Sequence, residues 1–385
     1  MDTVSCQLKL GAWEIDTRDD PHTELVRVVV DHAMNSPVAQ CRVSLFVSPA
    51  KAPGLLDQAI GAAASLVGIG GAAAAAPAFS IDVRGKPVAH DDAMEITLGV
   101  GDARQAVMKA TVVSVRNQFG RVEIEGRTAL GTLARARTDV VYSNQSAGDI
   151  ISALAGEGSV DVGQVDAGDT YAYVVADSGA SLFEHVRRVA ALEGMDVYDD
   201  TAGALVAKVF TKTSADHTLH YGIEVLDVRV GHAVSVLDKV RVTGEGPAGT
   251  AGPPKWHQLL LDPSPVQASA GDGVGLYETS RAAARSTAAA DRLAKALFGA
   301  AHDAATSGTI RVMGNAAIAL GDAVEIKDAP WDDVNGTYKV VRVRHVVGRT
   351  EGFVTTLGVT GLGGASSAAG LLGQAAGALA GAIGL

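Results

Sequence analysis

The sequence predicts a mainly β protein with an α+β insert: two small β-barrel domains with a small α/β domain between them. Short runs in which apolar and polar residues alternate fill residues 1–142 and 216–362, as in strands with one buried face. Residues 143–215 differ, because two apolar-periodic runs there begin at serine residues typical of helix caps. A chain of 385 residues is long enough to bury two or three cores.

The first domain is predicted to span residues 1–142. Its alternating segments are separated by turns rich in aspartate, asparagine and proline. An Ala/Gly-rich insertion at residues 48–78 interrupts them. The expected strands are residues 6–10, 25–30, 41–47, 79–83, 94–100, 106–116 and 121–128.

The α/β domain is predicted to span residues 143–215. Ser146 begins an apolar-periodic run that Gly156 ends, and Ser181, with Glu184 three residues later, forms a capping box for a second helix that stops at Gly194. The expected strands of this domain are residues 171–175, 195–198 and 204–210.

The second β-barrel domain is predicted to span residues 216–362. Strands are expected at 222–229 and 235–243, followed by a long Gly/Pro/Ser-rich loop over 244–275 and an Ala-rich helix over 279–304. Three consecutive strands joined by short turns close the domain, and Asn335-Gly336 is one of the turn dipeptides. These closing strands are residues 322–327, 338–347 and 353–359.

An uncharged Gly/Ala-rich tail follows at residues 363–385. Gly373, Gly377 and Gly381 recur at the four-residue spacing of closely packed helices. A low-complexity extension, packing against a partner or pore wall, and membrane insertion are three readings of this tail. Because glycine dilutes the apolar residues both here and in the 48–78 insertion, no stable membrane span is expected.

Composition excludes several classes of partner and site. A net charge of −11 disfavours nucleic-acid recognition. Cys6 and Cys41 are too few for a disulfide scaffold or a structural zinc site, and are expected to be buried thiols. No phosphate-binding loop, metal-binding motif or nucleophile motif is present, so no cofactor, metal or catalytic residue is expected. The N-terminus lacks the order of a signal peptide, which predicts synthesis and assembly in the cytoplasm.

A few polar residues are candidates for chemistry or for contacts. The pairs Asp91-Asp92, Asp199-Asp200 and Asp332-Asp333 fall in predicted turns, where aspartates cap or face solvent; catalytic acids would need a second converging cluster. His217 and His220 are predicted to lie on opposite strand faces, and His345 to be a satisfied strand histidine. Three arginines recur at roughly helical spacing, as a solvated face or a subunit contact: Arg281, Arg285 and Arg292.

Several passages, in this order, resemble the baseplate hub proteins of contractile tails: the phage late control D family and the N-terminal hub part of VgrG. Residues 92–116 resemble two adjoining strands of that family, although a usual glycine is absent. Leu133 to Ile151 resembles its L-x-R-x-R and Y-x-x-x-S-x-x-D-I-I passage, and Ser178 to Gly194 its S-D-x-x-F-L-x-R-L-A-x-E-x-G helix. The closing strands, residues 321–357, resemble its final strands. The likeness covers roughly residues 90–360.

The resemblance implies a structural hub that is not an enzyme. Three subunits, each with two barrels, would form a trimeric ring of six that joins a six-fold tail tube to a three-fold spike. Its implied partners are the tube protein, a separate spike protein, other baseplate proteins and cargo in the lumen. The particle would be a phage tail, a tail-like bacteriocin or an injection system. The alternatives are a tail-associated carbohydrate- or peptidoglycan-cleaving enzyme, supported only by the aspartate pairs, and a membrane-associated β-protein.

Overall fold

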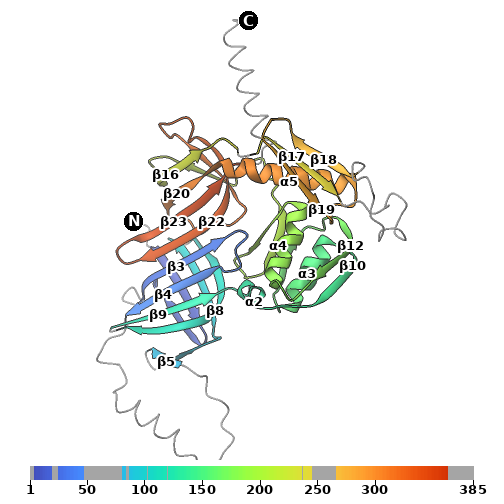
Figure 1. The fold of residues 1–385 in the computed structure, drawn as a ribbon. Helices are drawn as coiled ribbons and strands as arrows, with labels where there is room; N and C mark the ends of the chain where they lie inside the picture. The colour runs from blue at the N-terminus through green and yellow to red at the C-terminus, as the bar shows by residue number, and fades with distance from the viewer. Residues whose placement is uncertain are drawn as a thin grey trace, which may run out of the picture.

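The computed structural model describes residues 4–19, 25–46, 80–83, 86–101, 103–118, 120–235, 237–244 and 266–362. The predicted insertion at 48–78 and the tail at 363–385 lie outside these residues, as do Gly373, Gly377 and Gly381. The described chain is mainly β, as the sequence predicts, and its strands pair mostly antiparallel around one large sheet of thirteen strands (Figure 1).

The N-terminal half of this sheet is an antiparallel run of strands in the order β3-β4-β9-β8-β7-β1-β2. Alternating apolar residues explain it, because each strand turns one face to a single core that includes Leu8, Val43, Ile96 and Ile124. Strand β2, which has four residues, is not among the predicted strands. The strands are β1 (Val4–Leu10), β2 (Trp13–Asp16), β3 (Leu25–Ala33), β4 (Gln40–Phe46), β7 (Ala93–Val100), β8 (Ala103–Gln118) and β9 (Arg121–Arg127), with β5 (Ser80–Val83) and β6 (Lys86–Ala89) forming a separate hairpin.

The C-terminal half continues the same sheet. The three closing strands are confirmed, and β22 is long enough to pair with two neighbours along one edge: its first residues pair with β21, and residues 342–348 pair with β3 (Figure 1). The two halves of the chain are therefore joined by main-chain hydrogen bonds. The strands are β15 (His217–His220), β16 (Val225–His232), β20 (Thr306–Met313), β21 (Ala323–Lys327), β22 (Gly336–Gly348) and β23 (Gly352–Thr360).

Residues 130–209 form an α/β unit around one core. Both predicted helix starts are confirmed, because the Ser146 and Ser181 hydroxyls accept hydrogen bonds from the backbone N–H groups of Asp149 and Glu184. Gly194 ends the second helix in the left-handed conformation, with φ of 72°, whereas the first runs past Gly156 to Glu157. The elements are α2 (Leu130–Leu133), β10 (Val140–Ser146), α3 (Ala147–Glu157), β11 (Val162–Val165), β12 (Thr170–Ala176), α4 (Leu182–Glu193), β13 (Met195–Asp199) and β14 (Leu205–Val209).

The structure of residues 239–305 differs from two of the predictions. The loop expected over 244–275 contains strand β18 (Gln267–Gly271), and the helix expected from residue 279 begins only at Thr287, as α5 (Thr287–Ala305). The preceding residues form β19 (Leu276–Arg281), which pairs with β17 (Lys239–Gly244). The physical reason is local: the Ser286 hydroxyl caps α5 by accepting from the Ala289 N–H, and α5 packs its alanines on this small sheet.

Strand pairing runs as an open path from β16 to β2 within the described residues. No pair there closes either half into a barrel, so the two predicted barrels are not shown.

Candidate functional site

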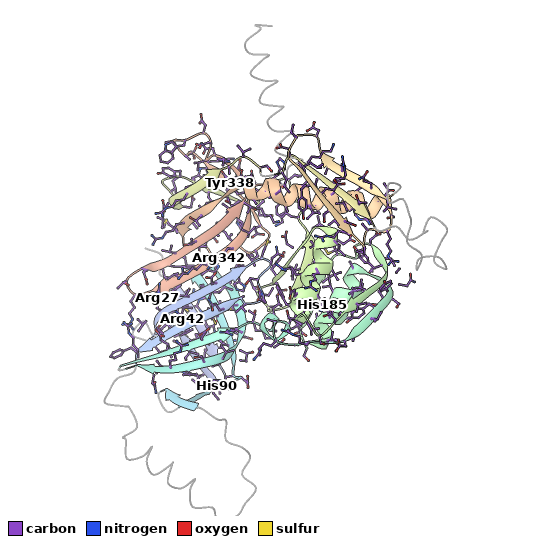
Figure 2. The ribbon with its side chains drawn as sticks, in the orientation of Figure 1. Arg27, Arg42, His90, His185, Tyr338 and Arg342 are labelled. Carbon is purple, nitrogen blue, oxygen red and sulfur yellow. The ribbon has the colours of Figure 1, made fainter. Side chains whose placement is uncertain are left out.

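The junction between the two halves of the sheet carries an ion pair on its outer face. The Arg342 guanidinium, on β22, donates to both oxygens of Asp31, on β3, at 2.8 and 2.6 Å. Arg27 and Arg42 belong to the neighbouring strands β3 and β4, and Figure 2 marks all three arginines along this sheet. A bidentate pair of this kind fixes the register of two strands that lie more than 300 residues apart in the sequence.

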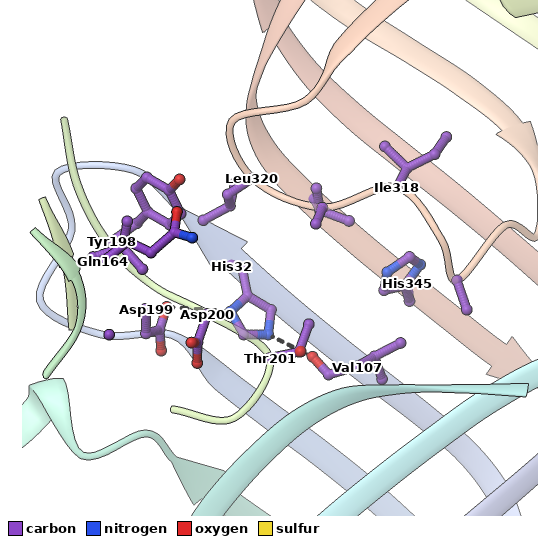
Figure 3. A pocket seen from close by; sticks show the side chains of 15 residues that line it. His32, Val107, Gln164, Tyr198, Asp199, Asp200, Thr201, Ile318, Leu320 and His345 are labelled. Carbon is purple, nitrogen blue, oxygen red and sulfur yellow. Dashed lines mark hydrogen bonds and ion pairs between the residues drawn. The ribbon is translucent and has the colours of Figure 1, made fainter. Parts of the chain in front are cut away.

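A pocket of about 330 Å³ opens where the two sheet halves meet the α/β unit (Figure 3). His32 of β3 lies in its wall, with ring Nδ1 3.3 Å from Asp199 Oδ1 and ring Nε2 3.1 Å from the Val107 carbonyl oxygen. Both neighbours are hydrogen-bond acceptors. The His32 ring thus links strand β3 to Asp199 of the α/β unit and to Val107 of strand β8.

His345 lies across the same pocket (Figure 3) and is almost fully buried. Its Nδ1 is 2.9 Å from the Thr355 hydroxyl. Burial, and secondarily the charge of His32, lowers the pKa of His345 to about 3, so this ring is neutral at ordinary pH. The prediction of a satisfied structural histidine is confirmed.

The aspartate pairs lie in separate places. Asp92 accepts from the Ala89 N–H and Asp200 from the Ala202 and Ala204 N–H groups, so both cap turns as predicted. Asp332 and Asp333 are exposed. Asp199 was wrongly predicted, since it is buried against His32, and no sequence signal marks that contact.

His217 and His220 bind different carboxylates, at 3.2 Å from Asp322 and 2.6 Å from Asp328. Among the described residues, no group of three or more histidine, cysteine, aspartate or glutamate side chains could hold a metal ion. Cys6 and Cys41 are buried thiols, as predicted. Over the same residues, no helix has the length and apolar character needed to cross a bilayer.

The three predicted arginines do not share a helix face. Arg281 ends strand β19, Arg285 lies in the turn before the cap of α5, and only Arg292 is helical. Arg292 pairs with Asp169 and lies 3.5 Å from Glu193, which ties α5 to the α/β unit. The Arg285 guanidinium lies 5.0 Å above the Tyr173 ring. Whether these arginines also contact another subunit stays a prediction.

One end of the large sheet is an open edge that exposes large apolar side chains. In the described chain, β16 pairs only with β20, apart from an isolated bridge between Tyr221 and Val225. Beside it, Ile223 is 67% exposed, Leu226 52% and Met313 55%. The Met313 N–H donates to the Glu224 carbonyl, which places Met313 at the start of β16. An open edge with apolar neighbours is typical of a surface that another chain covers.

The fold resembles that of solved phage tail proteins. The 43 kDa tail protein of prophage MuSo2 from Shewanella oneidensis has a TM-score of 0.65 and 13% identity, over 93% of this chain and 98% of that one. The tail protein from Neisseria meningitidis MC58 has a TM-score of 0.64 and 13% identity, over 93% and 96%. At these identities the similarity establishes a shared fold, and it covers nearly the whole chain.

A third solved structure is the c3393 protein of E. coli, a component of the type VI secretion system with structural similarity to the T4 bacteriophage tail proteins gp27 and gp5. It has a TM-score of 0.54 and 8% identity, over 92% of this chain and 76% of that one. No protein-family model matches the sequence, and no curated protein matches it.

Proposed function

We propose that this chain is a structural baseplate hub of a contractile tail or injection system. It would assemble as a homotrimer whose ring joins a six-fold tail tube to a three-fold spike, and whose lumen can hold cargo. The tail-protein fold over nearly the whole chain supports this proposal.

The observation that carries the proposal is the open β16 edge. A monomer in water would leave unpaired main-chain groups next to Ile223 and Leu226, an arrangement that promotes pairing with another chain. The opposite end of the strand path, β2, is a second edge. Pairing of one subunit's β16 end with the next subunit's β2 end would repeat the β22–β3 junction between chains and would close a ring.

Each subunit contributes the two halves of its large sheet, so a trimer would present six such halves. That number would match the symmetry of a six-fold tube. In such a ring the two halves would complete the barrels that the sequence predicts. The tail at 363–385 is proposed, from its glycine spacing alone, to pack near the three-fold axis against spike or cargo. Deleting it should change spike or cargo retention and leave the ring intact.

The molar mass in solution tests the assembly. We expect light scattering to give three times the 39.2 kDa of one chain, and electron microscopy to show rings. Leu226→Lys should shift the population toward monomer, because it places a charge in the buried contact. Val274→Lys is the matched control, since Val274 is 97% exposed and lies away from this edge. A wild-type chain that stays monomeric, and forms no ring with tube and spike proteins, would contradict the proposal.

A tail-associated hydrolase is the alternative, and the separation of the three aspartate pairs gives it no support from geometry. A peptidoglycan turnover assay on the purified protein distinguishes the two functions.

A further inference from the structure

A groove of about 780 Å³ lies beside the α/β unit, between strand β12, helix α4 and the first turns of α5. Seven consecutive residues, 169–175, line one wall. Successive side chains of a strand point to opposite faces of its sheet. A groove lined by seven consecutive residues therefore runs along the edge of β12 and not over one face. The opposite wall is formed by residues 281–286 and α5, and α4 contributes Val189 and Leu192.

The edge of β12 that faces this groove is open. Among the described strands, β12 pairs only with β10, and no β10 residue lines the groove. The groove therefore offers main-chain N–H and C=O groups along an edge of seven residues. An extended segment of another chain can add to such an edge as a new strand.

The β10–β12 strand pair exposes apolar side chains beside the groove. Val141 is 60% exposed, Tyr173 55% and Val175 51%. Val141 and Val175 are directly opposite each other in the β10–β12 ladder and so lie on one face. Tyr173, Val175, Leu192 and Leu297 also line the groove, so its lining offers apolar side chains that an added strand can cover.

The rim of the groove is positively charged, although the whole chain carries a net charge of −11. Arg188, Arg281 and Arg285 line it, and the Arg285 guanidinium lies over the Tyr173 ring. Asp169, an acidic residue of the lining, is paired with Arg292. Arg188 lies 3.3 Å from Glu184, so Arg281 and Arg285 are the lining guanidinium groups that we consider for a partner's carboxylates.

Contacts within the chain hold β12, α4 and α5 together around the groove. Tyr171 donates its hydroxyl to Glu193 at 2.5 Å, and burial together with this bond raises the pKa of the phenol, so it stays protonated. Arg292 adds its pairs with Asp169 and Glu193. These contacts fix β12 against α4 and α5, so the groove exists before any partner binds.

We propose that this groove binds an extended, acidic segment of a partner protein by strand addition to β12. Carboxylates of the segment would pair with Arg281 and Arg285, and its alternate apolar side chains would cover Tyr173 and Val175. The site goes beyond ring assembly, because it lies on the α/β unit and uses none of the β16 edge residues. It holds whether the chain is a trimer or a monomer.

A labelled peptide of alternating glutamate and valine, about eight residues long to match β12, is the probe. We expect saturable binding by fluorescence anisotropy, and no binding of a lysine–valine peptide of equal length. Arg281→Glu combined with Arg285→Glu should weaken binding at least about tenfold, which is about 1.4 kcal/mol. Arg121→Glu is the matched control: an exposed arginine on β9, remote from the groove, whose loss should leave the affinity unchanged.

Hydrogen exchange on the wild-type protein separates strand addition from loose electrostatic binding. The glutamate–valine peptide should slow exchange of the β12 amides, residues 170–176, and leave β16 unaffected. Absence of saturable binding up to about 1 mM, equal binding of the lysine–valine peptide, or protection outside β12 would overturn the proposal. Self-association that Arg281→Glu with Arg285→Glu abolishes would assign the groove to a second copy of this chain, and would also overturn it.

Discussion

Replacing His345 with asparagine should remove much of the acid sensitivity of the folded protein. The native ring stays neutral down to a pKa of about 3, whereas an unfolded histidine binds a proton near pH 6.5. Because the folded-state pKa is below the unfolded one, the unfolded state gains the proton first as the pH falls. The free energy of unfolding is therefore fully retained above about pH 6.5 and is lost progressively toward pH 3.

The magnitude follows from the two pKa values. Each pH unit below about 6.5 costs about 1.4 kcal/mol, so the wild type should lose about 2 kcal/mol from this residue by about pH 5. Asparagine does not titrate, and its amide can keep the hydrogen bond to Thr355. It loses the packing of the ring on Phe353, whose centroid lies 5.9 Å away, so we expect about 1 kcal/mol lower stability at neutral pH.

Urea unfolding at about pH 7.5 and about pH 5, followed by circular dichroism, measures the effect. His345→Asn should lose about 2 kcal/mol less than the wild type over this interval. His90→Asn removes an exposed imidazole from a turn and controls for a histidine outside the core. Equal losses in the wild type and His345→Asn would refute the argument that burial holds this ring neutral.

Three further changes test the core and the α/β unit. Burial raises the pKa of both Cys6 and Cys41 to about 12, so a thiol reagent should react with them only after unfolding, and rapid reaction of the native protein would contradict their burial. Ser181→Ala removes the cap on the Glu184 N–H and should lower the free energy of unfolding in urea by about 1 kcal/mol, whereas Ser181→Thr should retain most of it. Leu357→Ala opens a cavity in the C-terminal core and should cost about 2–5 kcal/mol, seen as a lower melting temperature; a change below about 1 kcal/mol would show that the site collapses around the smaller residue.

Residues whose structure depends on their immediate neighbours were predictable. The closing strands were placed within a few residues, because period-2 alternation and the Asn335-Gly336 turn are local signals. The caps at Ser146 and Ser181 were equally clear, since a hydroxyl and a backbone N–H three residues apart are sufficient. The helix expected over 279–304 includes the Thr279 to Arg281 end of strand β19, because this end runs into the Ala-rich segment, whereas the cap at Ser286 marks the observed start of α5.

Local patterns in the sequence predict the β-rich character of this chain, the two capped helices of its α/β unit and a structural histidine at His345, because alternation and capping act over a few residues. Three features appear only in the folded chain: β22 pairs with β3, Asp199 contacts His32, and Arg281 and Arg285 line a groove instead of sharing a helix face with Arg292. Those contacts join residues separated by long stretches of sequence, and no local pattern encodes which strand edge stays open. The surfaces on which both proposals rest are therefore products of packing.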